Sequence, residues 1–172
     1  ISNKILYDEK TLMKNGYPKI QKLGACSPNG EMTPFVWQGR LMRLELIDPS
    51  KGIDPSQAKA GIRDVETGKF ISYLADDSYF HSAFIDDDTA YVTGVDRQRR
   101  DTIRLYESKD LIHWTDRDLF TNPQWVYFNS QITKGPDGYV IIIESGPDAY
   151  PHLADTDYPK KYVGHNSWTM FF

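Results

Sequence analysis

Three segments of the chain share one pattern, two apolar runs around a short polar turn, and they begin about 48 residues apart. The segments cover residues 33–46, 81–95 and 129–145, and they open with Thr33, His81 and Asn129. Gly, Asp and Pro occupy the turns, at residues 38–39, 86–88 and 135–138. Apolar runs joined by such turns are typical of β-hairpins. The sequence therefore predicts three hairpins in regular succession.

A second, offset repeat follows the first two hairpins. Residues 62–69 (IRDVETGK) and 103–110 (IRLYESKD) match at Ile, Arg, Glu and Thr/Ser. Each is predicted to form the next strand outward from its hairpin. Four short strands in a unit of about 40–50 residues are the signature of a β-propeller. A β-sandwich is the alternative, but it does not predict two offset repeats. We expect an all-β chain with the propeller architecture.

The predicted organisation is a lead-in at residues 1–30, with a strand–turn–strand around Asn15 and Gly16, followed by blades over residues 31–172. The third hairpin is followed by a polar loop at 146–167 and by the apolar start of a strand at 168–172. The chain thus holds about two and a half to three blades. Because so few blades cannot close a ring, we expect either further residues or self-association through the open blade edges.

Composition narrows the classes of partner. The net charge of −4 disfavours nucleic acid, which needs a basic face, and no apolar run approaches the roughly 20 residues that span a membrane. A single cysteine, Cys26, permits neither an internal disulfide nor a thiolate zinc site. We expect no metal and no cofactor. The acidic segment 155–159 is a weak candidate for structural calcium, since it lacks the spacing of a known loop.

Residues 108–114 (SKDLIHW) carry the clearest motif. Ser108 and Asp110 are suited to hydrogen-bond nearby backbone N–H groups in a turn, with Leu111 and Trp114 as apolar plugs. This Ser-x-Asp-Leu-x-x-Trp pattern resembles the outer-strand motif of the five-bladed β-propeller glycoside hydrolases, the family 43 enzymes and their β-fructosidase relatives. Residues 39–46, 101–114 and 128–145 are also similar to segments of that superfamily.

The resemblance covers the N-terminal part of such a propeller and implies a function. It implies hydrolysis of O-glycosidic bonds in a plant- or host-derived oligo- or polysaccharide by carboxylate acid/base chemistry. It also implies a periplasmic or extracellular location. In that superfamily the site lies on the central axis, lined by the residues that open the innermost strand of each blade. Here those residues are Thr33, His81 and Asn129, where the superfamily places acids.

Two carboxylates remain as candidates for the catalytic acid and base. Glu45 and Glu144 each end an apolar strand and are expected at the same place in the first and third blades. An acid at the edge of apolar surface is a candidate for a raised pKa and for general-acid duty. The structural alternative is a strand-end Glu that meets Arg43 or solvent.

The candidate substrate-binding residues are polar or aromatic side chains of the three hairpins: Thr33, Arg43, His81, Asn129 and Trp37. Arg43 shares a strand face with Glu45, and Trp37 is suited to stack on a sugar ring, although aromatic residues also fill cores. The missing acids leave a non-catalytic carbohydrate-binding propeller as the alternative function. A structural propeller that binds no sugar is a third possibility.

Overall fold

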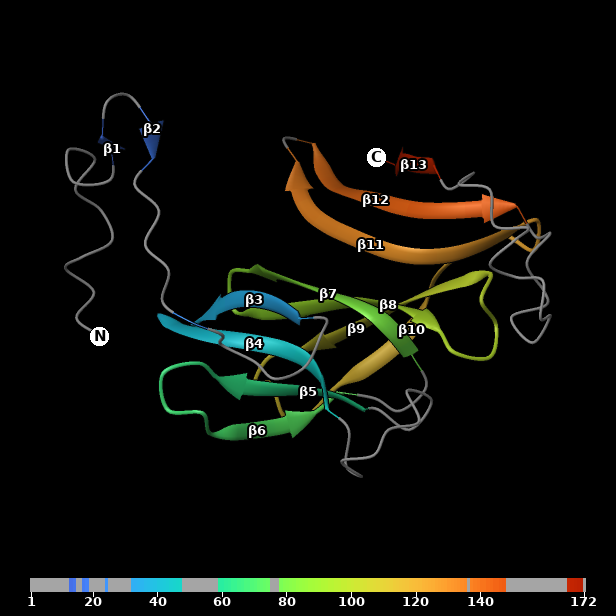
Figure 1. The fold of residues 1–172 in the computed structure, drawn as a ribbon. Helices are drawn as coiled ribbons and strands as arrows, with labels where there is room; N and C mark the ends of the chain where they lie inside the picture. The colour runs from blue at the N-terminus through green and yellow to red at the C-terminus, as the bar shows by residue number, and fades with distance from the viewer. Residues whose placement is uncertain are drawn as a thin grey trace.

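The computed structural model describes residues 24, 32–47, 59–74, 78–135 and 137–146 in full, together with the backbone of 13–14, 17–18, 147 and 167–171. These residues form strands and connecting turns, with no helix among them, so the chain is all-β as predicted. Two short strands in the lead-in, β1 (Met13–Lys14) and β2 (Tyr17–Pro18), pair with each other. The remaining strands make three antiparallel sheets (Figure 1).

Each sheet is a meander whose strands pair in chain order. The first sheet contains β3 (Met32–Trp37), β4 (Arg40–Ile47), β5 (Lys59–Asp64) and β6 (Phe70–Tyr73). The second sheet contains β7 (Ser78–Asp86), β8 (Thr89–Asp96), β9 (Thr102–Ser108) and β10 (Thr115–Thr121). The third sheet contains β11 (Trp125–Gly135), β12 (Gly138–Pro147) and β13 (Ser167–Phe171). The three predicted hairpins are confirmed. The outward strand predicted over 103–110 is β9, whereas the one predicted over 62–69 begins three residues earlier and ends at Asp64, with a turn following it.

The strand openers Thr33, His81 and Asn129 recur about every 48 residues. The hairpin turns recur at an interval that is one residue longer. The residues that close the turns pair as Trp37 with Arg40, Asp86 with Thr89, and Gly135 with Gly138. In the first turn Gln38 and Gly39 have φ angles of 48° and 76°. Positive φ at both central residues is the type I′ turn that suits the twist of a two-residue hairpin. The turns therefore fix the registers, and the registers fix which side chains share a face.

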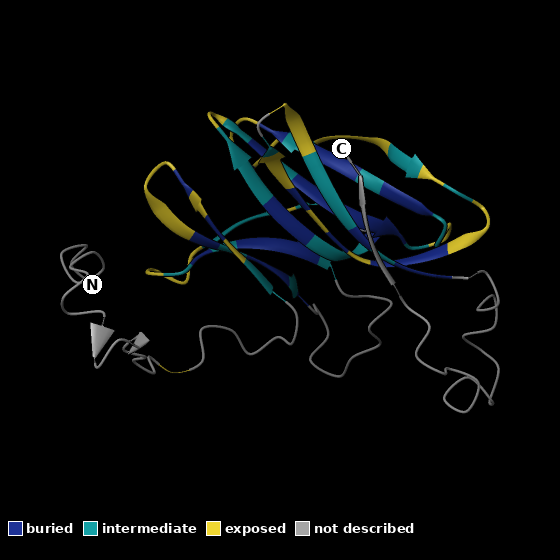
Figure 2. Cartoon of the chain, turned by 90° about the horizontal axis from the view of Figure 1, so that it is seen from above, coloured by how far each residue is buried: buried dark blue, intermediate teal, exposed yellow. Residues whose placement is uncertain are grey.

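The first strands of the sheets are neighbours in space, with β7 between β3 and β11 (Figure 1). A large apolar cluster joins the first and second sheets and includes Leu44, Ile62 and Val92. A smaller cluster joins the second and third sheets and includes Val95 and Ile143. Buried residues run along the strands that pack between sheets, while exposed residues include the hairpin tips and most of β10 (Figure 2). Each sheet is thus held by the packing of its face against the next sheet.

The motif at residues 108–114 forms the predicted turn. The Ser108 hydroxyl accepts from the backbone N–H of Leu111 at 2.9 Å, and the Asp110 carboxylate accepts from that of His113 at 2.8 Å. Leu111 is buried in the cluster between the first and second sheets, with Trp114 packed against it. The Ser72 hydroxyl of β6 donates to the Leu111 carbonyl, which ties the two sheets together. This turn has a structural role.

Candidate functional site

A β-bulge places His81 at the start of the second sheet. The pairing of β7 with β8 shifts between Tyr79 and Ser82, so Phe80 and His81 together face the single residue Gly94. Phe80 has a φ of 56°, a left-handed conformation that is uncommon for a large side chain. Bulges re-aim side chains and are enriched beside functional sites. The bulge therefore turns His81 out of the regular alternation of the strand.

A matching bulge places Asn129 in the third sheet. The pairing of β11 with β12 shifts between Tyr127 and Ser130, so Phe128 and Asn129 face the single residue Glu144. The Asn129 side-chain amide donates to Glu144 Oε2 at 2.7 Å. Two predicted site residues, one for binding and one for catalysis, are therefore brought into direct contact. Alternating strand geometry alone would not have predicted this contact.

Side chains and backbone link the openings of the three first strands. The Thr33 hydroxyl donates to the His81 carbonyl at 3.1 Å and joins β3 to β7. The Ser82 hydroxyl donates to Gln131 Oε1 at 2.6 Å and joins β7 to β11. The rings of the bulge residues Phe80 and Phe128 lie 6.1 Å apart between their centroids. Phe80 and Phe128 thus connect the two bulges, and neither was among the predicted site residues. Each directly precedes a predicted strand opener, which was the sequence signal that could have identified it.

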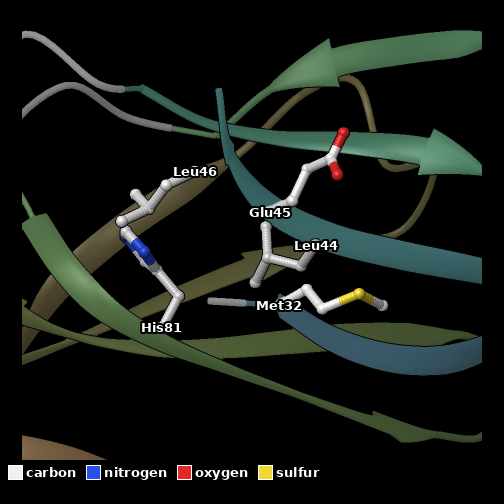
Figure 3. A pocket seen from close by; sticks show the side chains of 5 residues that line it. All are labelled: Met32, Leu44, Glu45, Leu46 and His81. Carbon is white, nitrogen blue, oxygen red and sulfur yellow. The ribbon is translucent and has the colours of Figure 1, made fainter. Parts of the chain in front are cut away.

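His81 lines a small hollow between the first two sheets. Its other lining residues are Met32, Leu44, Glu45 and Leu46, and it leaves about 10 Å³ for the centres of water-sized groups (Figure 3). The imidazole lies beside Leu46, whereas the Glu45 carboxylate points away from the imidazole. On this measure a space of about 10–15 Å³ holds a single water molecule. The hollow is therefore suited to one small group of a ligand rather than to a whole saccharide.

His81 is held as a neutral side chain. Burial lowers its pKa to about 3, and the Arg97 guanidinium contributes to the lowering. Ser78 Oγ lies 2.8 Å from His81 Nε2, and the Tyr106 hydroxyl donates to Ser78 Oγ at 2.8 Å. Ser78 is fully buried, so a ligand cannot reach its hydroxyl as a nucleophile. The residues around His81 suit hydrogen bonding and not proton donation.

Glu45 is clamped by two arginines. The Arg43 and Arg63 Nε atoms each lie 2.9 Å from a different oxygen of the carboxylate, and Glu45 is 2% exposed. The predicted contact between Arg43 and Glu45 is confirmed. Arg63 was missed, because it joins the cluster only through the register that sets it opposite Arg43. Charge-assisted bonds to both oxygens favour the ionised carboxylate, which disfavours general-acid duty.

The expectation that Glu45 and Glu144 occupy equivalent places is wrong. Glu45 lies five residues after the turn-closing Arg40, and Glu144 lies six after Gly138. A shift of one residue changes the face of a strand. Leu44 directly precedes Glu45, and Ile143 directly precedes Glu144. Leu44 packs against the second sheet from the side of the first sheet, and Ile143 packs against it from the side of the third sheet. The two carboxylates therefore point outward on opposite sides of the second sheet.

Trp37 is not at the site, contrary to the expectation that it stacks on a sugar. It is 6% exposed and belongs to the core cluster between the first two sheets. It ends β3, four residues beyond Thr33, which is about 13 Å along an extended strand. The indole fills the core near the turn, so its face is not available to a ligand.

The described part of the chain contains no group of three or more His, Cys, Asp or Glu that could hold a metal ion. The calcium candidate at 155–159 and Cys26 lie outside the described residues. Among the described residues there is no helix long and apolar enough to cross a membrane. The chain matches no protein-family model and no curated protein.

Proposed function

We propose that the three sheets are consecutive blades of a five-bladed β-propeller, with β3, β7 and β11 nearest the axis. Three features support this: the meander order of each sheet, the adjacency of the first strands and the apolar contact between successive sheets. The regular recurrence of the hairpin turns fits one blade per repeat. Residues 31–172 would then form the blades, and residues 1–30 would precede them.

The proposed function is hydrolysis of O-glycosidic bonds in an oligo- or polysaccharide. The observation that carries it is the contact of Glu144 with Asn129 at the bulge that opens β11. The amide of Asn129 and the hydroxyl of Thr33 are suited to hydrogen-bond sugar hydroxyls. The half-buried carboxylate of Glu144 is suited to acid/base chemistry. The resemblance of residues 108–114 to the propeller hydrolases supplies the reaction class.

In this proposal Glu144 is the acid/base residue, and Asn129 orients its carboxylate through the hydrogen bond to Oε2. Glycoside hydrolysis normally takes two carboxylates. Glu45 does not qualify, because both of its oxygens are bound by arginines. The second carboxylate would come from outside the residues that the structure describes.

A second candidate function is carbohydrate binding without catalysis. The clamp on Glu45 favours it, as do the uncharged strand openers Thr33, His81 and Asn129. Under this proposal the contact between Asn129 and Glu144 forms a polar binding surface. The Glu144 carboxylate would then accept hydrogen bonds from sugar hydroxyls and transfer no proton.

One experiment separates the two functions. The complete protein is tested for glycan-array binding and for release of reducing sugar from each bound glycan, as wild type, Glu144→Gln and the exposed control Glu66→Gln. For a hydrolase, Glu144→Gln lowers turnover about 100-fold or more and leaves binding intact, while the control matches wild type. Binding of glycans by wild type without cleavage supports the binding function. Absence of any glycan binding overturns both.

A further inference from the structure

The proton on His81 can be located from its hydrogen-bond partners. Ser78 has one hydroxyl proton and no exposure to water, and it already accepts a hydrogen bond from the Tyr106 hydroxyl. Among the described residues, the only other partner of the Ser78 hydroxyl is His81 Nε2, at 2.8 Å. A buried hydroxyl that donates to nothing is costly, so the Ser78 proton is expected to go to Nε2.

The other neutral tautomer, with the proton on Nε2, leaves one donor without an acceptor. With a proton on Nε2, the Ser78 oxygen would receive two donors, and its own proton would have no acceptor. With Nε2 as the acceptor, every donor in the chain from Tyr106 through Ser78 to His81 is used. A neutral imidazole carries its proton on one nitrogen only, so the remaining proton belongs to Nδ1.

Gly94 explains how the ring is seated. A Cβ atom at this position would lie 2.9 Å from His81 Cδ2 and 3.1 Å from Ser78 Oγ. The Cδ2–Nε2 edge of the imidazole therefore packs closely over β8, in space that only a glycine leaves. The other edge carries Nδ1. Among the described residues Nδ1 has no hydrogen-bond partner, yet it is not one of the polar atoms sealed from solvent; the hollow is the opening that His81 lines, so we take Nδ1 to face it.

From this arrangement we infer that Tyr106 and Ser78 lock His81 in the Nδ1–H tautomer, so that it presents a neutral hydrogen-bond donor at the hollow and takes no part in proton transfer. The lone pair of Nε2 is occupied by Ser78, so the ring is not a base. The group that His81 would bind is an acceptor oxygen, such as a sugar hydroxyl or ring oxygen. Only this choice of ligand rests on the proposed function.

The charged neighbour reinforces the assignment. The Arg97 guanidinium donates to the Ser78 carbonyl at 3.3 Å, which holds a positive charge beside the histidine. A second positive charge on the imidazole would be disfavoured there. Tyr106 and Ser78 are accordingly positioning residues: neither reaches a ligand, and both act by fixing the proton on His81.

The test is a long-range ¹H–¹⁵N correlation spectrum of the complete labelled protein, recorded from pH 8 to pH 5, with His81 assigned from a His81→Gln variant. The expected result is the Nδ1–H pattern for His81 at every pH. An Nε2–H pattern, or an imidazolium pattern within this range, overturns the inference. Because no ligand or turnover is involved, the outcome is independent of whether the protein binds or hydrolyses glycans.

A pair of serine variants tests the cause of the tautomer. Ser78→Ala removes the donor to Nε2 and should move His81 toward the Nε2–H form. Ser130→Ala is the matched control, because Ser130 is a buried serine whose hydroxyl donates to Thr93 and not to His81. An unchanged Nδ1–H pattern in Ser78→Ala, in a folded variant, would show that Ser78 does not set the tautomer.

Discussion

Acid should destabilise this protein through His81 well before its aspartates titrate. The pKa of His81 is about 3 in the folded protein and about 6.5 in an unfolded chain. Below pH 6.5 the unfolded state therefore binds a proton that the folded state does not, and stability falls as pH falls. Well above pH 6.5 the histidine is neutral in both states, and its contribution is constant.

The magnitude is set by the separation of these two pKa values. The slope approaches about 1.4 kcal/mol per pH unit once the unfolded histidine is protonated. Between pH 6.5 and pH 4.5 the accumulated loss is about 2 kcal/mol. Aspartates such as Asp64 and Asp86 have pKa values held below 3.8, by hydrogen bonds from Thr67 and Lys134 respectively. Their stabilisation is present above pH 3.8 and is lost only below this window.

The assay is urea unfolding at pH 6.5, 5.5 and 4.5, followed by tryptophan fluorescence, for wild type and His81→Gln. Glutamine keeps a polar group near Ser78 but does not titrate. Wild type should lose about 2 kcal/mol more than the variant across the window, with similar m-values. Parallel losses, within about 0.5 kcal/mol, would refute the assignment of His81 as a half-buried side chain that stays neutral.

Three further changes probe the packing around the site. Arg63→Gln removes one of the two cations that bind Glu45 and should lower the free energy of unfolding in urea by about 1–2 kcal/mol. The control Arg117→Gln, at an exposed ion pair, should lower it by less than about 0.5 kcal/mol. Equal losses would contradict the binding of Glu45 by two arginines. Leu111→Ala should cost about 2–4 kcal/mol in the same assay, and a cost below about 1 would show that Leu111 does not join the sheets. Gly61→Ala places a Cβ 2.4 Å from Ile47 Cδ1 and should cost about 1–3 kcal/mol. Adding Ile47→Val removes the clashing methyl and should restore part of this loss, and no restoration would point to another cause.

The hairpins could be predicted from sequence because their signals are local. A two-residue turn such as Gln38-Gly39 and the alternation of the flanking strand are both read within about a dozen residues. The same holds for the turn at Ser108 and Asp110, whose side chains bind backbone groups two or three residues away. Local hydrogen bonding is visible in sequence, so these elements agree with the structure.

The faces of the strands could not be predicted, because they depend on register. The sequence repeat aligns the strand openers Thr33, His81 and Asn129, but the turns recur at an interval one residue longer. Bulges interrupt β7 and β11 near His81 and Asn129, whereas the pairing of β3 with β4 is continuous from Met32. Each inserted residue changes the strand face of the residues after it. An offset of one residue was therefore enough for the repeat to assign Glu45 and Glu144 the same place, although their carboxylates point to opposite sides.

The same register decides which carboxylate the arginines bind. Protonating Glu45 would weaken two charge-assisted bonds from arginines, each worth about 1.5–3 kcal/mol before discounting the partly exposed Arg63. Glu144 has the side-chain amide of Asn129 beside it, which donates to its Oε2 at 2.7 Å. In the proposed hydrolase Glu144 is therefore the candidate acid/base residue in place of Glu45, because arginines bind both oxygens of Glu45. Glu45 would remain an anion that holds β4 and β5 together through Arg43 and Arg63.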